Sequence, residues 1–172
     1  MFIDVGAHIG RYTVLFASFF KKVVAVEPDP YNFLILRKNV LLNGFGNVIL
    51  FNVGCFSKDG EGVLYLSPIN FGGHSLKGSD DFVGSVRVCL KRLDDVVLEA
   101  NVDYCDVGLV KIDVEGVEGE VLLGAHGLLS VGSPVIVVES LNLVRVFRIL
   151  SSYGYRLVGV DLVGHNFLFV KR

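Results

Sequence analysis

The sequence of 172 residues contains no tryptophan, one methionine, four prolines and only three cysteines. Cys55, Cys89 and Cys105 form no CxxC pair, so the cysteines provide no metal-binding motif. An odd, scattered set of thiols predicts reduced and mostly buried side chains in a cytoplasmic protein. The four histidines also lack a metal-ligand spacing such as HExxH. We therefore expect no metal site and a cytoplasmic location.

An excess of positive charge is also missing. The 16 basic and 18 acidic residues give a formal net charge of −2, and they form no basic block. Sequence-independent binding of nucleic acid depends on such a block, so no nucleic-acid partner is expected.

The sequence offers little support for a membrane span. The longest stretch without a formal charge, residues 121–138, only reaches the length of roughly 18 residues at which a span is considered. It contains three glycines and a proline, so a helix end, a turn and a buried strand explain it better. Met1 leads directly into a strand-like segment that contains Asp4, and no signal peptide is expected.

The sequence does have a high hydrophobic fraction of 52% and a mean hydropathy of +0.57. Strands that are buried on both faces of a parallel sheet produce such apolar segments. Strands are predicted at 2–5, 23–26, 48–53, 107–112 and 135–138, alternating with helices at 11–20, 30–43, 118–127 and 141–153. Asp29 has the features of an N-cap followed by Pro30. This alternation predicts an α/β fold with a parallel sheet.

Two strand pairs complete the prediction. Segments 62–66 and 83–90 flank a polar, glycine-rich loop at 70–81, which predicts an inserted hairpin or flap. Segments 155–160 and 167–170 predict an antiparallel pair at the C-terminus. The expected architecture is a three-layer sandwich with a mostly parallel sheet, formed by a single domain over residues 1–172.

The first motif, Asp4-Val-Gly6-Ala-His8-Ile-Gly10, follows the first predicted strand. Glycines in such a turn allow a tight bend and a close approach of the backbone to a ligand. The spacing is DxGxxxG rather than the GxGxxG of dinucleotide-binding enzymes. The acid at the strand end would suit a cationic ligand, and an ordinary turn between strand and helix is the alternative.

The second and third motifs follow the next two predicted strands. Glu27 lies 21 residues after Gly6, a spacing at which an acid can accept hydrogen bonds from ribose hydroxyls. A surface glutamate is the alternative for Glu27 taken alone. The segment from Asn52 to Ser57 lies where open α/β sheets bind ligands, so it could border an adenine or be an ordinary loop.

Candidate catalytic residues come from two further segments. Asp113 and Glu115 follow the strand at 107–112, on the same expected sheet edge as the first motif. Close carboxylates can raise one another's pKa, which suits a general base, whereas acids that stabilise a helix N-terminus are the alternative. His74 in the flap could be a base or a substrate contact, or a solvent-exposed histidine.

Taken together, these motifs resemble the FkbM family of methyltransferases, which belongs to the class I group with a Rossmann-like fold. The resemblance spans nearly the whole chain in the family's order, and the combination of the KIDVEG and EPxP elements is specific. The matching segments are FIDVGAHIGRYT (2–13), VVAVEPDPYNF (23–33), KNVLLNGFGNV (38–48), Gly72-Gly-His-Ser75, LDDV (93–96), VKIDVEGVEGEVLLGA (110–125) and GHNFLFVK (164–171).

The resemblance implies that the chain binds S-adenosylmethionine. Glu27, in the EPxP element with Pro28, would bind the ribose, and Asn52 and Ser57 would lie by the adenine. The residues implied at the methionine end are Asp4, Gly6, Ala7, His8, Gly10, Tyr12 and Thr13. The family often has an acid where Ser57 aligns and an asparagine where His8 stands. Relatives usually carry residues before the first strand, so the N-terminal cover is expected to be absent or truncated.

The function implied is O-methylation of a hydroxyl on a sugar, glycan or secondary metabolite. Asp113 is the expected base, with Glu115 and His74 as alternatives. Two other functions stay open, a non-catalytic S-adenosylmethionine-binding domain and, with less support, a nicotinamide-dependent oxidoreductase. A nucleic-acid methyltransferase is disfavoured by the charge and by the missing N/D-P-P-Y/F signature. The partners expected are a small-molecule or glycan acceptor and, through an apolar edge near the N-terminus, a second copy in a homodimer.

Overall fold

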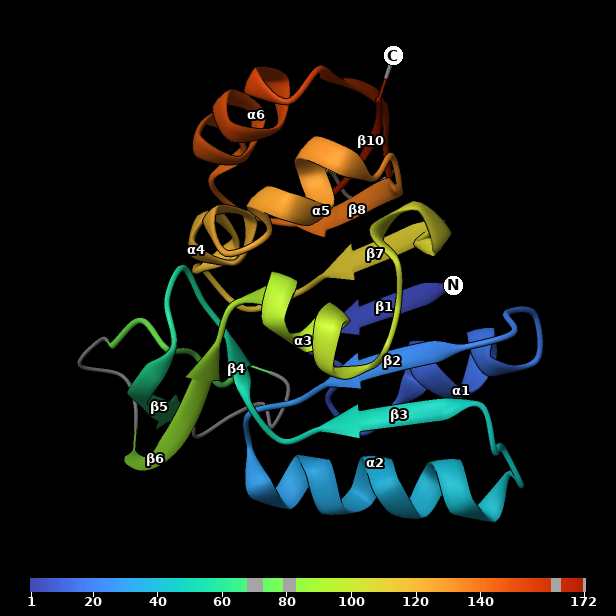
Figure 1. The fold of residues 1–172 in the computed structure, drawn as a ribbon. Coiled ribbons are helices and arrows are strands. Elements are labelled where there is room, and N and C mark those ends of the chain that lie inside the picture. Colours follow the sequence, from blue (N-terminus) through green and yellow to red (C-terminus); the bar gives the residue numbers. More distant parts are fainter. Residues whose placement is uncertain (68–72, 79–82, 162–164, 172) are drawn as a thin grey trace.

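A computed structural model describes residues 1–67, 73–78, 83–161 and 165–171. Its main sheet has seven strands in the order β3-β2-β1-β7-β8-β10-β9 (Figure 1). The strands are β1 (Phe2–Val5), β2 (Val23–Val26), β3 (Val48–Phe51), β7 (Leu109–Ile112), β8 (Val135–Glu139), β9 (Tyr155–Val160) and β10 (Asn166–Lys171). Most of their residues are apolar, as expected for strands buried on both faces.

The sheet has the predicted strand directions. β1 pairs in parallel with β2 on one side and with β7 on the other, and the parallel order continues to β3 and β8. β10 is antiparallel to both β8 and β9. The mostly parallel sheet and the antiparallel C-terminal pair are therefore confirmed.

Helices cover both faces of this sheet, which confirms the three-layer sandwich. One face carries α1 (Arg11–Ala17) and α2 (Pro30–Leu42). The other carries α3 (Leu93–Glu99), α4 (Glu118–Leu123), α5 (His126–Val131) and α6 (Leu143–Ser152). A short 3-10 helix, η1 (Tyr104–Asp106), precedes β7. Figure 1 shows α3 and α5 in front of the sheet and α1 behind it.

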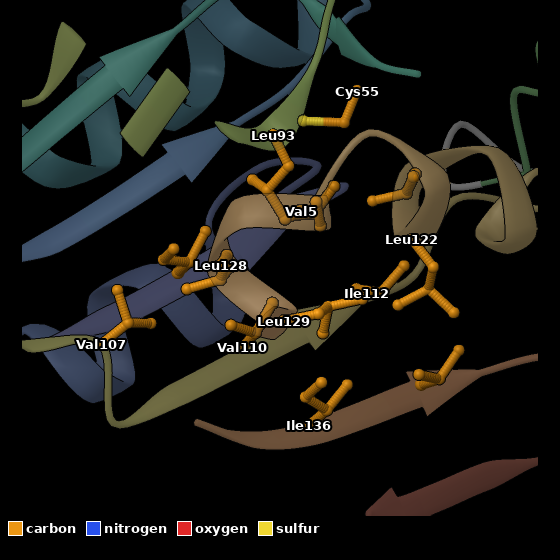
Figure 2. Close-up of a cluster of buried hydrophobic side chains, with 14 of the residues drawn as sticks. Val5, Cys55, Leu93, Val107, Val110, Ile112, Leu122, Leu128, Leu129 and Ile136 are labelled. Carbon is orange, nitrogen blue, oxygen red and sulfur yellow. The ribbon is translucent and has the colours of Figure 1, made fainter. Parts of the chain in front are cut away.

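Alternating side chains of each strand supply the two hydrophobic layers. Phe2 packs with Ala17 and Val23 on the α1 side, whereas Ile3 and Val5 point into the larger cluster on the opposite face. Figure 2 shows that larger cluster, in which β7 and β8 meet leucines of α4 and α5. Burial of each large aliphatic side chain contributes about 1.5–3 kcal/mol, so this layer fixes the strand ends on which the site is built.

The inserted hairpin is confirmed and is part of a second, three-stranded sheet. β5 (Gly60–Leu66) pairs antiparallel with β6 (Gly84–Lys91), and the short strand β4 (Gly54–Cys55) pairs in parallel with β6. Of the predicted flap at 70–81, residues 73–78 are described, and Ser75 bridges back to Tyr65 of β5. Residues 70–72 and 79–81 lie outside the described part. This small sheet lies beyond the carboxyl ends of β1, β2 and β7 (Figure 1).

Three predictions about the fold need correction. The helix expected at 118–127 is two helices, α4 and α5, and between them the backbone at Gly124 lies so close to Phe56 that a Cβ there would be 2.1 Å from the Phe56 carbonyl oxygen. Helix α1 ends at Ala17 rather than at residue 20. The thiols are not mostly buried, since Cys55 is buried but Cys89 and Cys105 are exposed.

The N-cap prediction for α2 is confirmed, because the Asp29 carboxylate accepts a 2.7 Å hydrogen bond from the Asn32 backbone N–H and Pro30 opens the helix. α3, by contrast, was not predicted. Within the described ranges, no helix combines the length and the apolar character that a membrane span requires.

Candidate active site

The site lies where the strand order reverses. From β1 the chain continues to β2 and β3 on one side and later returns to β7 on the other, so the carboxyl ends of β1, β2 and β7 meet at a topological switch point. Ligands of open α/β sheets bind at such points. A cleft of about 520 Å³, counting its part open to solvent, is found there. Its lining includes Val5, Gly6, His8, Val26, Glu27, Pro28, Asn32, Gly54, Cys55, Leu64, His74, Leu76, Asp113, Val114, Glu115 and Val117.

Gly6 brings these strand ends together. Its φ of 81° is in the left-handed region, and a Cβ at this position would lie 1.8 Å from the carbonyl oxygen of Asp113. The Gly6 N–H donates a 3.0 Å hydrogen bond to the carbonyl of Val26 at the end of β2. Only glycine allows the turn after β1 to contact the ends of β2 and β7 at once.

Glu27 occupies the end of β2 and is 5% exposed. Its Oε2 accepts a 2.8 Å hydrogen bond from the His8 backbone N–H, and its Oε1 accepts one of 2.9 Å from the Asp29 backbone N–H. Burial raises the pKa of this carboxyl to about 7, although the two N–H donors oppose the shift. Each carboxylate oxygen can accept more than one hydrogen bond, so Glu27 keeps acceptor capacity toward the cleft.

His8 lies beside Glu27 with a backbone φ of 53°. Its Nε2 is buried and has no hydrogen-bond partner within the described ranges. Burial, and then repulsion from His74, lower the pKa of His8, so the imidazole is neutral near pH 7. Glu115, across the cleft, also has a positive φ, of 50°. Such backbone conformations of non-glycine residues are costly and concentrate at functional sites.

Asp4 lies beneath the cleft rather than in its lining. It is 1% exposed, and its Oδ2 accepts a 2.6 Å hydrogen bond from the Thr13 hydroxyl. Burial is the main cause of its raised pKa. Next to it on β7, Lys111 donates a 2.7 Å hydrogen bond to Asp113 Oδ2, and the Lys111 ammonium is 4.6 Å from the ring centroid of Tyr12. Asp4, Thr13 and Lys111 are buried, and they support the turn above them.

His74 lies on the β2 side of the cleft. Its Nδ1 accepts a 3.0 Å hydrogen bond from the Ser67 backbone N–H, and its Nε2 is 3.9 Å from the Asp29 carboxylate. The neighbouring Ser75 donates a 2.6 Å hydrogen bond to the carbonyl of Glu115. The described part of the flap is thus tied to the loops after both β2 and β7.

The other predicted site residues do not line the cleft. Asn52 donates hydrogen bonds of 2.8 and 3.1 Å to the carbonyls of Glu27 and Pro28, and so joins the ends of β2 and β3. Ser57 lies instead by the Glu120 carboxyl of α4 and helps to lower its pKa. Ala7 is 5% exposed and Gly10 is the N-cap of α1. These residues hold the loops that form the cleft.

A second cavity of about 860 Å³, counting its part open to solvent, lies next to the cleft and shares Asp113 and Glu115 with it. Its other lining residues are Lys77, Gly116, Glu118, Glu139, Ser140, Leu141, Asn142 and His165. Glu118 is 4% exposed and accepts hydrogen bonds from the Gly116 N–H, at 2.6 Å, and the Ser140 hydroxyl, at 3.2 Å. This carboxylate joins the loops after β7 and β8.

Sequence reasoning missed Lys111 and Glu139. Lys111 could have been noticed as a charge inside an apolar strand, and Glu139 as an acid at the carboxyl end of the next strand. Burial is the main cause of the raised pKa of Glu139, and the charge of Asp113 adds to it. Lys111 lies beside the cleft, and Glu139 lines the adjoining cavity.

These features fit a nucleoside-containing ligand better than a metal ion. Within the described residues, no group of three or more His, Cys, Asp or Glu side chains is arranged to hold a metal. Glu27 offers acceptors for ribose hydroxyls, and the orphaned Nε2 of His8 offers a polar contact in the same cleft.

Comparisons with known proteins identify similar chains. Residues 4–157 match the family model of the methyltransferase FkbM domain. "Methyltransferase 1" of Beauveria bassiana is 27% identical over 142 residues, which cover 71% of this chain and 57% of the fungal protein. This chain therefore spans little more than half the length of that relative.

Two solved structures share the fold. The methyltransferase FkbM of Methylobacillus flagellatus superposes with a TM-score of 0.68 at 18% identity, covering 98% of this chain and 42% of that one. A SAM-dependent methyltransferase of Aquifex aeolicus superposes with a TM-score of 0.55 at 15% identity, covering 98% of this chain and 80% of that one. At these identities the likeness concerns the fold alone. The family match over most of the sequence is stronger evidence, and it shows that this chain belongs to the FkbM methyltransferase domain family.

Proposed function

We propose that this chain transfers a methyl group from S-adenosylmethionine to a hydroxyl of a sugar, glycan or secondary metabolite. Membership of the FkbM family supports methyl transfer. The observation that carries the cofactor assignment is the buried Glu27 carboxylate, fixed by two backbone N–H donors at the carboxyl end of β2. An acid in this place is suited to bind the ribose of a nucleoside.

Different residues around the cleft would bind different parts of this cofactor. Glu27 would accept hydrogen bonds from the ribose hydroxyls, and Pro28 would border the nucleoside beside it. The turn from Gly6 to His8 would face the methionine end. Asp4 and Thr13 would not contact the cofactor; their hydrogen bond beneath the cleft would fix the conformation of that turn. When bound, the sulfonium of S-adenosylmethionine supplies both the methyl group and the leaving group.

The protein's part in the reaction is then alignment and proton removal. Holding the acceptor oxygen in line with the methyl carbon removes much of the entropic cost of the reaction. A positioned base can add about 10²–10⁴-fold for a hydroxyl acceptor. Asp113 lines both cavities, so its carboxylate would lie between the proposed cofactor and the acceptor. Glu115 shares this position, whereas the contact of His74 with Asp29 favours a role on the cofactor side.

Ligand binding to the full chain tests this proposal. Isothermal titration calorimetry should show binding of S-adenosylhomocysteine and none of NAD, since the turn after β1 lacks the GxGxxG spacing. Glu27→Ala should weaken S-adenosylhomocysteine binding by about 10- to 100-fold, the effect of losing hydrogen bonds to a charged group. Glu61→Ala, an exposed change on β5, is the matched control and should bind normally.

Two outcomes would contradict the proposal. Binding of NAD but not of S-adenosylhomocysteine would favour an oxidoreductase. Normal binding of S-adenosylhomocysteine by Glu27→Ala would show that the ligand does not use this cleft. Radiolabelled S-adenosylmethionine, offered with a panel of neutral sugars and glycosides, then separates an enzyme from a non-catalytic binding domain: incorporation of label into an ether-linked methyl group is the expected result.

A further inference from the structure

Glu139 and Asp113 form a carboxyl pair at the ends of two neighbouring strands. Ile112 of β7 is in register with Val138 of β8, and the next residue of each parallel strand is an acid. The charge of Asp113 acts on the Glu139 carboxyl, as expected for two acids at adjacent strand ends. This pair lies at the wall between the cleft and the second cavity, because Asp113 lines both spaces and Glu139 lines the second.

The two acids of this pair have different surroundings. The Lys111 ammonium, 7% exposed, is bonded to Asp113 Oδ2 at 2.7 Å, so Asp113 already has a cationic partner. Burial raises the pKa of Glu139, and the charge of Asp113 raises that pKa further, against a smaller opposing effect of Lys111. Because Asp113 is bound to Lys111, Glu139 is the acid of the pair that is better placed to accept a proton from a ligand in the second cavity.

From this geometry we propose that Glu139, beside Asp113 at the adjacent ends of β7 and β8, is the carboxylate that takes the proton from the acceptor hydroxyl, with the acceptor held in the cavity of about 860 Å³. The inference rests on the proposed function, since it concerns the acceptor side of the same reaction. Asp113 and Lys111 are then positioning residues, and their opposite charges act on Glu139 from the neighbouring strand.

The proton and electron balance of the step is simple. The acceptor oxygen forms a bond to the methyl carbon while the carbon–sulfur bond breaks, and the electron pair of that bond stays on sulfur, which becomes a neutral thioether. The O–H bond breaks, and its proton passes to Glu139. The protonated carboxyl returns the proton to water through the open side of the cavity.

Other charged groups surround Glu139, and they define what the cavity admits. Those that line the cavity or act on Glu139 are Lys111 of β7, Asp113 and Glu115 after β7, Glu118 of α4, Lys77 of the flap and His165 before β10. The Glu118 carboxylate accepts hydrogen bonds from Gly116 and Ser140, so it stabilises the wall of the cavity and does not contact the acceptor in this proposal. The balance of charge is negative, which suits a neutral, hydroxyl-rich acceptor better than an anionic one.

The test uses the charge difference between two ligands and needs no known acceptor. The full chain, ¹³C-labelled in its side-chain carboxyls, is titrated by NMR between about pH 4 and 8, first with saturating S-adenosylhomocysteine and then with S-adenosylmethionine. The proposal expects the pKa of Glu139 to lie above its ordinary value with the uncharged thioether bound. It expects that pKa to be lower with S-adenosylmethionine, because a neighbouring sulfonium favours the ionised carboxylate.

Internal controls make the result specific. Glu139→Gln identifies the signal by removing it, and the exposed carboxyl of Glu61 on β5 should respond equally to the two ligands. Asp113→Asn should lower the pKa of Glu139, because it removes the neighbouring negative charge.

The outcomes separate this inference from the proposed function. Equal pKa values of Glu139 with the two bound ligands would overturn the inference while leaving cofactor binding intact. A Glu139 that titrates in the ordinary range with S-adenosylhomocysteine bound would overturn it as well. Failure of both ligands to bind would instead refute the proposed function, and the inference with it.

Discussion

The hydroxyl of Thr13, in the first turn of α1, donates a 2.6 Å hydrogen bond to the carboxylate of Asp4 inside β1. Both residues are essentially inaccessible to solvent, and Oδ1 of Asp4 finds no partner in the described part of the chain. This bond joins the strand to the helix that follows it, and it closes the loop that carries Gly6 and His8. The acid of the DxGxxxG motif therefore acts on the shape of the turn, from below the cleft.

Removing this hydroxyl should destabilise the protein. In Thr13→Val the remaining oxygen of Asp4 would be buried without its donor, at a cost of about 1–3 kcal/mol. Thr13→Ser keeps the donor and loses one methyl group, so it should cost about 1 kcal/mol or less. Urea unfolding of the two variants measures the difference, and equal losses would show that the hydrogen bond contributes nothing to stability.

A side chain at Gly6 should be far more damaging than one at a glycine with the same backbone conformation. Gly6→Ala places Cβ against the Asp113 carbonyl, whereas at Gly44, with φ of 72°, an added Cβ would have nothing within 4 Å. Gly44→Ala should cost about 1–2 kcal/mol, from strain alone. We expect Gly6→Ala to cost about 3 kcal/mol or more, because overpacking adds to the strain. Thermal melts and S-adenosylhomocysteine titrations check both variants, and similar losses would contradict the close-approach argument.

The pKa of Glu27 predicts a pH dependence of stability. Because this pKa is raised from 4.5 to about 7, the folded state binds the proton more tightly than the unfolded state does. The stability of the wild type relative to Glu27→Gln should therefore be greatest below pH 4.5 and should fall as the pH rises to about 7. The total change is up to about 3 kcal/mol for a shift of this size. Denaturant unfolding at a series of pH values measures it, and a constant or growing difference would refute the buried-carboxylate account.

Asp94 should matter for stability and not for ligand binding. Its carboxylate on α3 accepts hydrogen bonds of 2.8 and 2.9 Å from the Gly127 and Leu128 backbone N–H groups of α5. Asp94→Ala should cost about 2–3 kcal/mol, because both bonds go to a charged acceptor. The control Asp95→Ala removes only the surface ion pair with Arg92 and should cost at most about 1 kcal/mol. Calorimetry with S-adenosylhomocysteine should give the wild-type affinity for both variants.

Local sequence signals were sufficient for most elements of the sheet and for α2. The strands β1, β2, β7 and β8 are short apolar segments between recognisable turns, and Asp29-Pro30 is a local helix-start signal. The positions of Gly6 and Glu27 at one edge followed from the rule that parallel strands end together. These inferences needed no knowledge of distant contacts.

The features that were missed depend on contacts between distant residues. The close approach of Phe56 to Gly124, between α4 and α5, joins residues that lie 68 positions apart in the sequence. The carboxyl pair of Asp113 and Glu139 arises from the pairing of β7 with β8. The burial of Asp4 beneath the cleft, likewise, follows from the packing of α1 and from its bond to Thr13. Periodicity and spacing carry no signal for such pairs.

The most direct test of the central claim is a crystal structure of the full chain with S-adenosylhomocysteine bound. The account predicts ribose hydroxyls within hydrogen-bonding distance of Glu27, and the sulfur on the side of the cleft where Asp113 meets the second cavity. A ligand bound elsewhere, or one bound in the cleft with its sulfur directed away from Asp113 and Glu139, would contradict it.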